Sequence, residues 1–420
     1  MTNCVEAEKN MRICMFTDSF LPYCSGVTFS VLNQASELVK RGHDVCVFRP
    51  KPRKRDIDEN TSVDMPKEVE VFDVPFSVGV SKVPKLRITL PSFISSLWRV
   101  RKWDPDVVHM STEWGCGWEG LIASKLLRKP TVGTFHTFFA DPGYLKSFGL
   151  PSFKFIQRFM WWYSVRFFNM CRFVTSPSKS VKDALIAHGI RFDPIIIPNG
   201  IERPVRVDAD DIMKKRNEIG IYGPAFVYCG RLSPEKSLDV VLKSFALVQK
   251  KRRRAKLVII GDGPVQADLE SLAKELGIED NVIFYGHVSH ERLIDENLLL
   301  LGDTFVTASK TENQPMSILE AMSFGLPIVG ANSKGIPELI EDQVNGLLFE
   351  PDNHEEMAQC MLRMANKRRQ RKRMGHGALA FAAEYQMPQV VDRLEEVYQQ
   401  AIEQSKSKRK RKPKTELVEK

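Results

Sequence analysis

Ala225-Phe-Val-Tyr-Cys-Gly-Arg-Leu-Ser-Pro-Glu-Lys236 predicts a buried strand, a turn and the start of a helix, in that order. Five apolar residues suit a strand covered on both faces, and Gly230 and Pro234 suit the turn that ends it. The helix is expected from about Lys236 to Lys250. A strand, a turn and a helix in succession form the repeating unit of a parallel sheet covered by helices.

The same unit recurs on both sides of this stretch, which predicts an α/β protein. We expect two Rossmann-like, doubly wound parallel-sheet domains, at residues 11–200 and 217–384, facing a central cleft at the carboxyl ends of their strands. Residues 201–215 are expected to be a polar linker. The other predicted strands are 12–17, 43–48, 106–110, 130–135, 173–176, 194–198, 256–260, 282–285, 304–307 and 327–330.

The composition is that of a globular protein with room for two or three domains, since 420 residues are 43% hydrophobic and 27% charged. No apolar run is long enough to cross a membrane, and the first residues do not resemble a signal peptide. The eight cysteines include no Cys-x-x-Cys. We therefore expect a reducing, cytoplasmic location, with no disulfide framework and no metal site.

The net charge of +9 is concentrated in two clusters, at residues 363–373 and in the tail 404–420, which is expected to be disordered. Residues 153–168 mix aromatic and basic side chains, and helical spacing places Phe155, Phe159, Trp162 and Arg166 near one face. Such a helix suits either core packing or a membrane interface. The basic clusters suit a solvated surface, an anionic membrane or, less well, nucleic acid.

Glu312-Asn-Gln-Pro-Met-Ser-Ile-Leu-Glu320 places two carboxylates on either side of a predicted helix start at Pro315. Their eight positions span roughly 12 Å, about the distance from a transferred sugar across a diphosphate to a ribose. The helix N-terminus between them favours a diphosphate, and both carboxylates can accept hydrogen bonds from sugar hydroxyls. The pattern therefore indicates a nucleotide-sugar site.

Other candidate residues follow strands at the same predicted edge. Arg231 and Lys236 could neutralise a diphosphate leaving group. The glycine of Ser25-Gly26 and the Gly261-Asp-Gly-Pro264 turn would let the backbone approach a ligand closely. His136 follows the strand at 130–135 and would contact the transferred sugar.

These motifs, in this order, resemble the retaining glycosyltransferases of family 4, which have the two-domain GT-B fold. The resemblance covers roughly residues 11–400 and includes Phe135-His-Thr137, Ser176-Pro-Ser178, Pro198-Asn-Gly-Ile201 and Gly335-Ile-Pro-Glu-Leu-Ile340. It departs from the usual pattern at Asn313-Gln-Pro315, where Gly-Phe-Gly is commoner, and at Lys334, where a glycine is usual.

The resemblance implies a role for each matched position. Arg231 and Lys236 would hold the diphosphate, Glu320 the ribose, and Glu312 and His136 the sugar, so that His136, Glu312, Arg231 and Lys236 form the catalytic set. The remaining implied donor contacts are Gly26, Gly261, His287, Val288, Asn313, Gln314, Met316 and Ser317. No cofactor or metal is implied beyond the nucleotide-diphosphate sugar. The last helix, residues 385–403, would return to the N-terminal domain.

The implied reaction is transfer of a hexose, with retention of configuration, to an acceptor hydroxyl. His136-Thr-Phe-Phe-Ala-Asp-Pro-Gly-Tyr144 resembles members that act on lipids, so a diacylglycerol or glycolipid acceptor at the inner membrane face is favoured. Asp18 and Tyr144 are the candidate acceptor residues. A soluble sugar or glycan acceptor, an NAD-dependent oxidoreductase and a nucleic-acid-binding protein remain alternatives, although no nucleic acid is expected. The sequence leaves open the donor (UDP-glucose or GDP-mannose), the oligomeric state and the tail's role.

Overall fold

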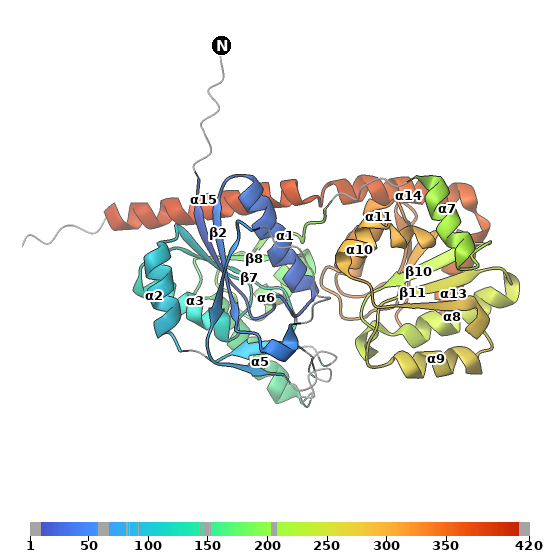
Figure 1. Ribbon diagram of the computed structural model, residues 1–420, viewed down its shortest axis with the longest axis horizontal. Helices are drawn as coiled ribbons and strands as arrows, with labels where there is room; N and C mark the ends of the chain where they lie inside the picture. Colours follow the sequence, from blue (N-terminus) through green and yellow to red (C-terminus); the bar gives the residue numbers. More distant parts are fainter. Residues whose placement is uncertain are drawn as a thin grey trace, which may run out of the picture.

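The computed structural model consists of two α/β bodies that lie side by side (Figure 1). It describes residues 10–57, 67–80, 83, 85–90, 92–140, 142, 145, 151, 153–202 and 208–410. Each body is built around a parallel sheet with helices on its faces. The predicted fold class, α/β with two doubly wound parallel sheets, is confirmed.

The N-terminal sheet has seven parallel strands in the order β3-β2-β1-β6-β7-β8-β9. Its strands are β1 (Arg12–Phe16), β2 (Asp44–Pro50), β3 (Glu70–Val74), β6 (Val107–Met110), β7 (Thr131–Thr134), β8 (Phe173–Ser176) and β9 (Ile195–Ile196). The helices of this body are α1 (Gly26–Lys40), α2 (Ile94–Trp103), α3 (Gly115–Leu126), α5 (Lys154–Phe168) and α6 (Lys179–Ala187). An antiparallel hairpin, β4 (Ser77–Gly79) with β5 (Arg87–Thr89), lies outside the sheet.

The C-terminal sheet has six parallel strands in the order β12-β11-β10-β13-β14-β15. Its strands are β10 (Ala225–Cys229), β11 (Lys256–Ile260), β12 (Val282–Gly286), β13 (Thr304–Thr307), β14 (Ile328–Ala331) and β15 (Gly346–Phe349). The helices are α7 (Ala209–Glu218), α8 (Leu238–Lys251), α9 (Gln266–Glu275), α10 (His290–Asp295), α11 (Met316–Ser323), α12 (Ile336–Leu339), α13 (His354–Asn366) and α14 (Arg368–Ala383).

Each central strand supplies side chains to both faces of its sheet. In β10, Phe226 and Tyr228 join the core on one face, while Ala225 and Val227 join the core on the other. Successive side chains of a strand point in opposite directions, so a strand covered on both faces must be apolar throughout. This is why the central strands were visible in the sequence as uninterrupted apolar runs.

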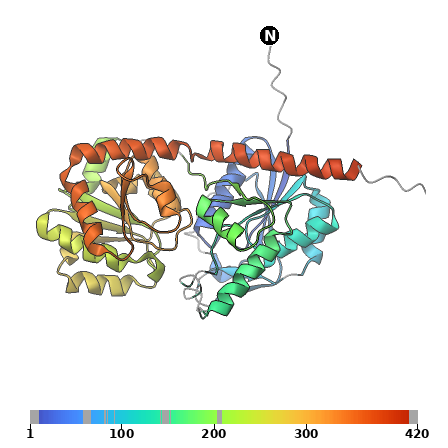
Figure 2. The same ribbon diagram turned by 180° about the vertical axis from the view of Figure 1, so that it is seen from behind.

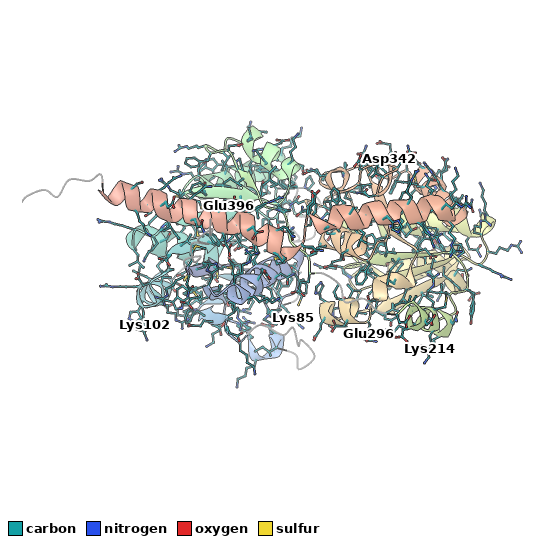
Figure 3. The ribbon with its side chains drawn as sticks, turned by 90° about the horizontal axis from the view of Figure 1, so that it is seen from above. Lys85, Lys102, Lys214, Glu296, Asp342 and Glu396 are labelled. Carbon is teal, nitrogen blue, oxygen red and sulfur yellow. The ribbon has the colours of Figure 1, made fainter. Side chains whose placement is uncertain are left out.

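Helix α15 (Met387–Lys410) follows the C-terminal domain in sequence but packs on the N-terminal domain. Figures 1 and 2 show it continuing from α14 and lying along the N-terminal body. Seen from above, Glu396 lies on this helix and Asp342 lies over the other domain (Figure 3). Val390, Leu394 and Val397 are buried in the N-terminal core, a spacing that forms one helical stripe.

The structure departs from the sequence predictions at the expected linker and at the start of the expected tail. The segment 201–215 is not wholly a linker, because α7 begins at Ala209, where the Asp208 side chain accepts a hydrogen bond from Asp210 N. The basic segment 404–410, predicted to be disordered, is helical. Lys and Arg are good helix formers, and extending an existing helix avoids the cost of nucleation. Residues 1–9 and 411–420 lie outside the described residues.

Candidate active site

The candidate residues lie where the carboxyl ends of strands from both domains meet. His136 follows β7, and Asn313 lies between β13 and α11. The Asn313 side-chain amide Nδ2 donates a 2.7 Å hydrogen bond to the His136 carbonyl oxygen. The structure thus brings the segments that contain the predicted His136 and Glu312 together, although they are far apart in sequence.

Lys236 forms an ion pair with Glu312, its amino group contacting carboxylate oxygen Oε1. Both side chains are mostly buried, with 23% and 18% of their surface exposed. The loop of Glu312 is held from the other side, because Gly335 N donates to the Glu312 carbonyl at 2.9 Å. A Cβ at position 335 would approach the Asn313 carbonyl oxygen to 1.6 Å, so this contact requires glycine.

Arg231 lies at the end of β10 with its side chain exposed. It lies close to Tyr23, in the loop before α1 of the other domain. Burial raises the pKa of Tyr23, and the nearby positive charge of Arg231 partly opposes this shift. Gly26 begins α1 in the same loop, is exposed, and has open space around it. Arg231 and Gly26 therefore lie on opposite sides of the boundary between the domains.

Glu320 lies in α11 and is paired with a residue that the sequence analysis did not identify. His290 Nε2 lies 2.8 Å from Glu320 Oε1, and the His290 ring packs on Phe29 of α1 with a centroid distance of 4.5 Å. Burial lowers the pKa of His290, but the charge and hydrogen bond of Glu320 outweigh this, so the net shift is upward. The sequence signal for His290 was slight, namely its position as the first residue of a helix capped by Ser289.

His136 is a neutral imidazole at physiological pH. Burial lowers its pKa to about 4, because desolvation disfavours the imidazolium. Such a ring can both donate and accept a hydrogen bond without adding charge beside a sugar. Nearby, buried His109 contacts Tyr398 of α15 at 2.7 Å and Thr134 of β7 at 2.6 Å.

Asn313 and Gln314 differ in how their polar atoms are used. Asn313 Oδ1 is buried and has no hydrogen-bond partner among the described residues, although its Nδ2 is engaged by His136. A buried acceptor without a partner is costly, and a ligand hydroxyl would satisfy it. Gln314 Oε1 instead accepts a 2.5 Å hydrogen bond from Asn199 N, so this side chain links the two domains.

The glycine turn after β11 packs against the loop that contains Arg231. Gly261 has φ +131°, and a Cβ there would approach the Gly230 carbonyl oxygen to 2.1 Å. Gly263 meets the Leu232 carbonyl in the same way, at 2.2 Å. These glycines position the Arg231 loop by close backbone packing.

The other predicted donor residues surround this region. His287 is exposed and lies 3.5 Å from the Asp262 carboxylate, while Val288 and Met316 pack partly against the C-terminal core. Met316 and Ser317 form the first turn of α11, which has no side-chain cap among the described residues. The sequence analysis predicted that the helix would start at Pro315. In the structure, Pro315 is instead the residue before the helix. The uncapped N–H groups of this turn favour an anion.

Lys334 and Phe138 make another contact between the domains. Lys334 has the left-handed φ of 51° that glycine adopts more easily, and its amino group lies 5.5 Å from the centre of the Phe138 ring. The unusual lysine thus contributes a cation–π contact between the domains.

The two predicted acceptor residues are Asp18 and Tyr144. Asp18 is 3% exposed, and its oxygens accept hydrogen bonds from Thr89 N, Thr112 Oγ1 and Cys116 N. Burial raises the pKa of Asp18 to about 6. This carboxylate holds loops together at the start of α3, and its role toward an acceptor stays a prediction. Tyr144 lies outside the described residues.

Among the residues that the structure describes, no group of three or more His, Cys, Asp or Glu side chains could hold a metal ion. Within the same ranges, no helix is both long and apolar enough to span a bilayer.

The comparisons with known proteins match both halves of the chain. The model of glycosyltransferase family 4 matches residues 24–203, and that of glycosyl transferases group 1 matches residues 211–380. The alpha-monoglucosyldiacylglycerol synthase of Streptococcus pneumoniae is 31% identical over 349 residues, which are 81% of this chain and 75% of that protein. The chain belongs to glycosyltransferase family 4.

This family 4 glycosyltransferase also resembles a GDP-mannose-dependent alpha-mannosyltransferase of Corynebacterium glutamicum, with 29% identity over 82% of this chain and 78% of that protein. Among solved structures, Anabaena Alr3699/HepE in complex with UDP has a TM-score of 0.74 at 21% identity, covering 93% of this chain and all of that one. The fold is therefore GT-B. The enzyme transfers a sugar from a nucleotide-sugar donor. This family assignment takes the place of the oxidoreductase and nucleic-acid-binding alternatives.

Proposed function

We propose that this glycosyltransferase transfers a hexose, with retention of configuration, to a hydroxyl group of a membrane lipid of the diacylglycerol or glycolipid type. The observation that carries the lipid acceptor is the set of large apolar side chains that the N-terminal domain exposes. Ile94 and Trp98 of α2 are 81% and 62% exposed, and Phe76 beside the β4–β5 hairpin is 71% exposed. Exposed side chains of this kind can enter the interface of a bilayer.

The names of relatives support the same acceptor. The Streptococcus pneumoniae protein is an alpha-monoglucosyldiacylglycerol synthase, and its similarity extends over most of both chains. The enzyme would then act as a peripheral protein on the cytoplasmic membrane face. A soluble sugar or glycan acceptor is the alternative, in which case the apolar residues would be ordinary surface.

In the proposed mechanism, Arg231 and Lys236 hold the donor diphosphate and stabilise its charge as the sugar departs. Glu320, oriented by His290, accepts hydrogen bonds from the ribose. The unpartnered Asn313 Oδ1 accepts one from the sugar, beside neutral His136. The leaving phosphate oxygen takes the acceptor proton on the same face of the sugar.

We also propose that no metal is required, since Arg231 and Lys236 together would supply the positive charge that a divalent ion provides elsewhere. Transfer rates should therefore be unchanged in EDTA. A rate that falls with EDTA and returns with added Mg²⁺ or Mn²⁺ would contradict this part of the proposal.

A donor screen tests the function. Release of nucleoside diphosphate from UDP- and GDP-hexoses is measured with a lipid extract, or a soluble glycan mixture, as the acceptor. We expect one donor to be used with the lipid extract. Glu320→Ala and Lys236→Ala should each lower turnover at least tenfold, about 1.4 kcal/mol. Near-normal kinetics in both variants would refute the donor site.

A further inference from the structure

A continuous series of hydrogen bonds runs from α1 of the N-terminal domain to the segment before α11. Gln34 Nε2 donates to Ser30 Oγ at 3.2 Å, and Ser30 Oγ donates to Asn199 Oδ1 at 3.0 Å. Asn199 N then donates to Gln314 Oε1 at 2.5 Å, and Asn199 Nδ2 donates to the Gln314 carbonyl at 3.4 Å. All four residues are buried, with at most 9% of their surface exposed. We call these four residues the cross-domain chain.

Asn199 lies where the backbone passes from one domain to the other. Two residues further on, Ile201 N donates to the Tyr385 carbonyl at 2.9 Å, and Met387 N donates to the Ile201 carbonyl at 3.0 Å. A Cβ at Gly200 would approach Met387 Cε to 2.6 Å, so the two backbone segments pack closely. Residues 199–201 and 385–387 therefore form one joint between the domains.

Gln314 lies on the donor side of this joint. It precedes Pro315 and the first turn of α11, which has no side-chain cap among the described residues and is the proposed place of the donor diphosphate. Because Gln314 Oε1 accepts from Asn199 N, this oxygen is occupied within the protein. The side chain thus ties the start of α11 to the joint.

The link depends on an acceptor at position 314. Without one, the buried Asn199 N would lose its partner, which costs more than the net value of an ordinary hydrogen bond. Gln314 stands where phenylalanine is commoner in the family pattern, and a phenyl ring could not replace the amide oxygen. Ser30 holds the other side of Asn199, so a change at either end should alter the geometry of the whole chain.

We propose that Gln314 is a positioning residue for donor binding. Through Asn199 it fixes the first turn of α11 relative to the joint between the domains, and Ser30 holds Asn199 from α1. This inference deepens the proposed function and rests on it, since the α11 turn is taken as the diphosphate site. The effect should fall on donor affinity, because His136 and Lys236 are not members of the cross-domain chain.

Steady-state kinetics with the preferred nucleotide-sugar test the proposal. Gln314→Met keeps a side chain of similar length without the acceptor, and should raise the donor KM about threefold to tenfold. The calorimetric Kd for nucleoside diphosphate should rise in parallel. The change in kcat should stay under about twofold, because the lost interaction contributes equally before and in the transition state.

Ser30→Ala should raise the donor KM in the same direction by a smaller factor. In the double variant with Gln314→Met, the increase should be smaller than the product of the single increases, because members of one hydrogen-bonded chain are energetically coupled. The matched control is Ser36→Ala, a buried serine of the same helix whose Oγ donates to the Leu32 carbonyl at 2.8 Å. It should leave the donor KM within about twofold of the unaltered value.

All variants are assayed well below their thermal midpoints, so that unfolding does not contribute. An unchanged KM and Kd in Gln314→Met would overturn the proposal, as would fully independent effects in the double variant or an equal rise in Ser36→Ala. Lys236→Ala separates this result from the donor site itself. A raised KM in Lys236→Ala with a normal KM in Gln314→Met would overturn the positioning role alone, whereas normal kinetics in both would also refute the donor site.

Discussion

The ion pair between Lys236 and Glu312 is the residue-scale feature that bears most directly on donor binding. The Lys236 charge is partly neutralised by this carboxylate. A diphosphate bound as proposed would therefore compete with Glu312 for Lys236, or bind beside both groups against the repulsion of a carboxylate. In the proposed donor site, the pair would hold the lysine in place and limit how tightly the nucleotide product is bound.

Glu312→Gln should uncouple binding from transfer. Because the variant removes the competing negative charge, nucleoside diphosphate should bind several-fold more tightly in a calorimetric titration, while sugar transfer falls at least tenfold. Glu355→Gln is the control, since it removes the same charge from an exposed position on α13. Weaker binding of the nucleoside diphosphate to Glu312→Gln would contradict this account of the pair.

Glu113 should make folding stability depend on pH. Burial raises the pKa of Glu113 to about 7, against a hydrogen bond from Ser164 Oγ. A carboxyl whose pKa is raised in the folded state stabilises that state below its unfolded pKa, and this stability is lost as pH rises through the folded pKa. The loss between about pH 4.5 and about pH 7 is on the order of 3 kcal/mol.

Glu113→Gln should therefore reduce the fall in unfolding free energy between about pH 5 and about pH 8, measured by urea denaturation. Glu396→Gln on α15 is the control, because that side chain is exposed. If the unfolding free energy of Glu113→Gln falls with pH as much as that of the unaltered protein, another group causes the pH dependence.

At the scale of elements, the start of α6 is held by the other domain. Glu338 in α12 accepts hydrogen bonds from Lys179 N and Ser180 N at 2.7 and 2.6 Å. A carboxylate at a helix N-terminus satisfies free N–H groups and complements the helix dipole. This contact couples the order of α6 to the approach of the C-terminal domain.

Glu338→Ala should destabilise α6 locally by about 1 kcal/mol, the usual cost of losing a helix cap. Amide hydrogen exchange should accelerate about fivefold at the start of α6 while the core strands are unaffected. Glu341→Ala, an exposed carboxylate just beyond α12, should show no such change. Unaltered exchange in α6 would mean that Ser178 alone is a sufficient cap.

The sequence predicted the buried elements well and the edges poorly. Strands β10 and β11 have the predicted bounds, because each is an apolar run covered on both faces. Strand β3, Glu-Val-Phe-Asp-Val, was missed because an edge strand tolerates charged residues that interrupt the apolar pattern. The four-residue edge strand β15 was also missed.

Some residues of the candidate site could be predicted from the sequence and others could not. Residues that follow strands, such as Arg231 and His136, could be predicted from their order along the chain, since parallel strands end at one edge. His290 could not, because its contacts with Glu320 and Phe29 exist only once the domains meet. The burial of Asp18 also depends on loops distant in sequence and could not be predicted from the sequence.

At the scale of the whole molecule, the two domains are joined by specific polar and aromatic contacts around the candidate site. Asn313 reaches the His136 carbonyl, and Phe29 packs on His290. Helix α15 completes the connection by burying its apolar stripe in the N-terminal core. The proposed donor residues of the C-terminal domain are thereby held against the N-terminal domain, whose outer surface carries exposed apolar side chains.

The most direct test of the account is transfer of radiolabelled hexose from the preferred nucleotide-sugar to diacylglycerol vesicles or to a soluble glycan mixture, with the label counted in the organic and aqueous phases. We predict label in the organic phase, reduced at least tenfold in Lys236→Ala and unchanged in Lys274→Ala, which alters an exposed lysine on α9. Label found only on soluble glycan, or equal organic-phase labelling by Lys236→Ala, would contradict the account.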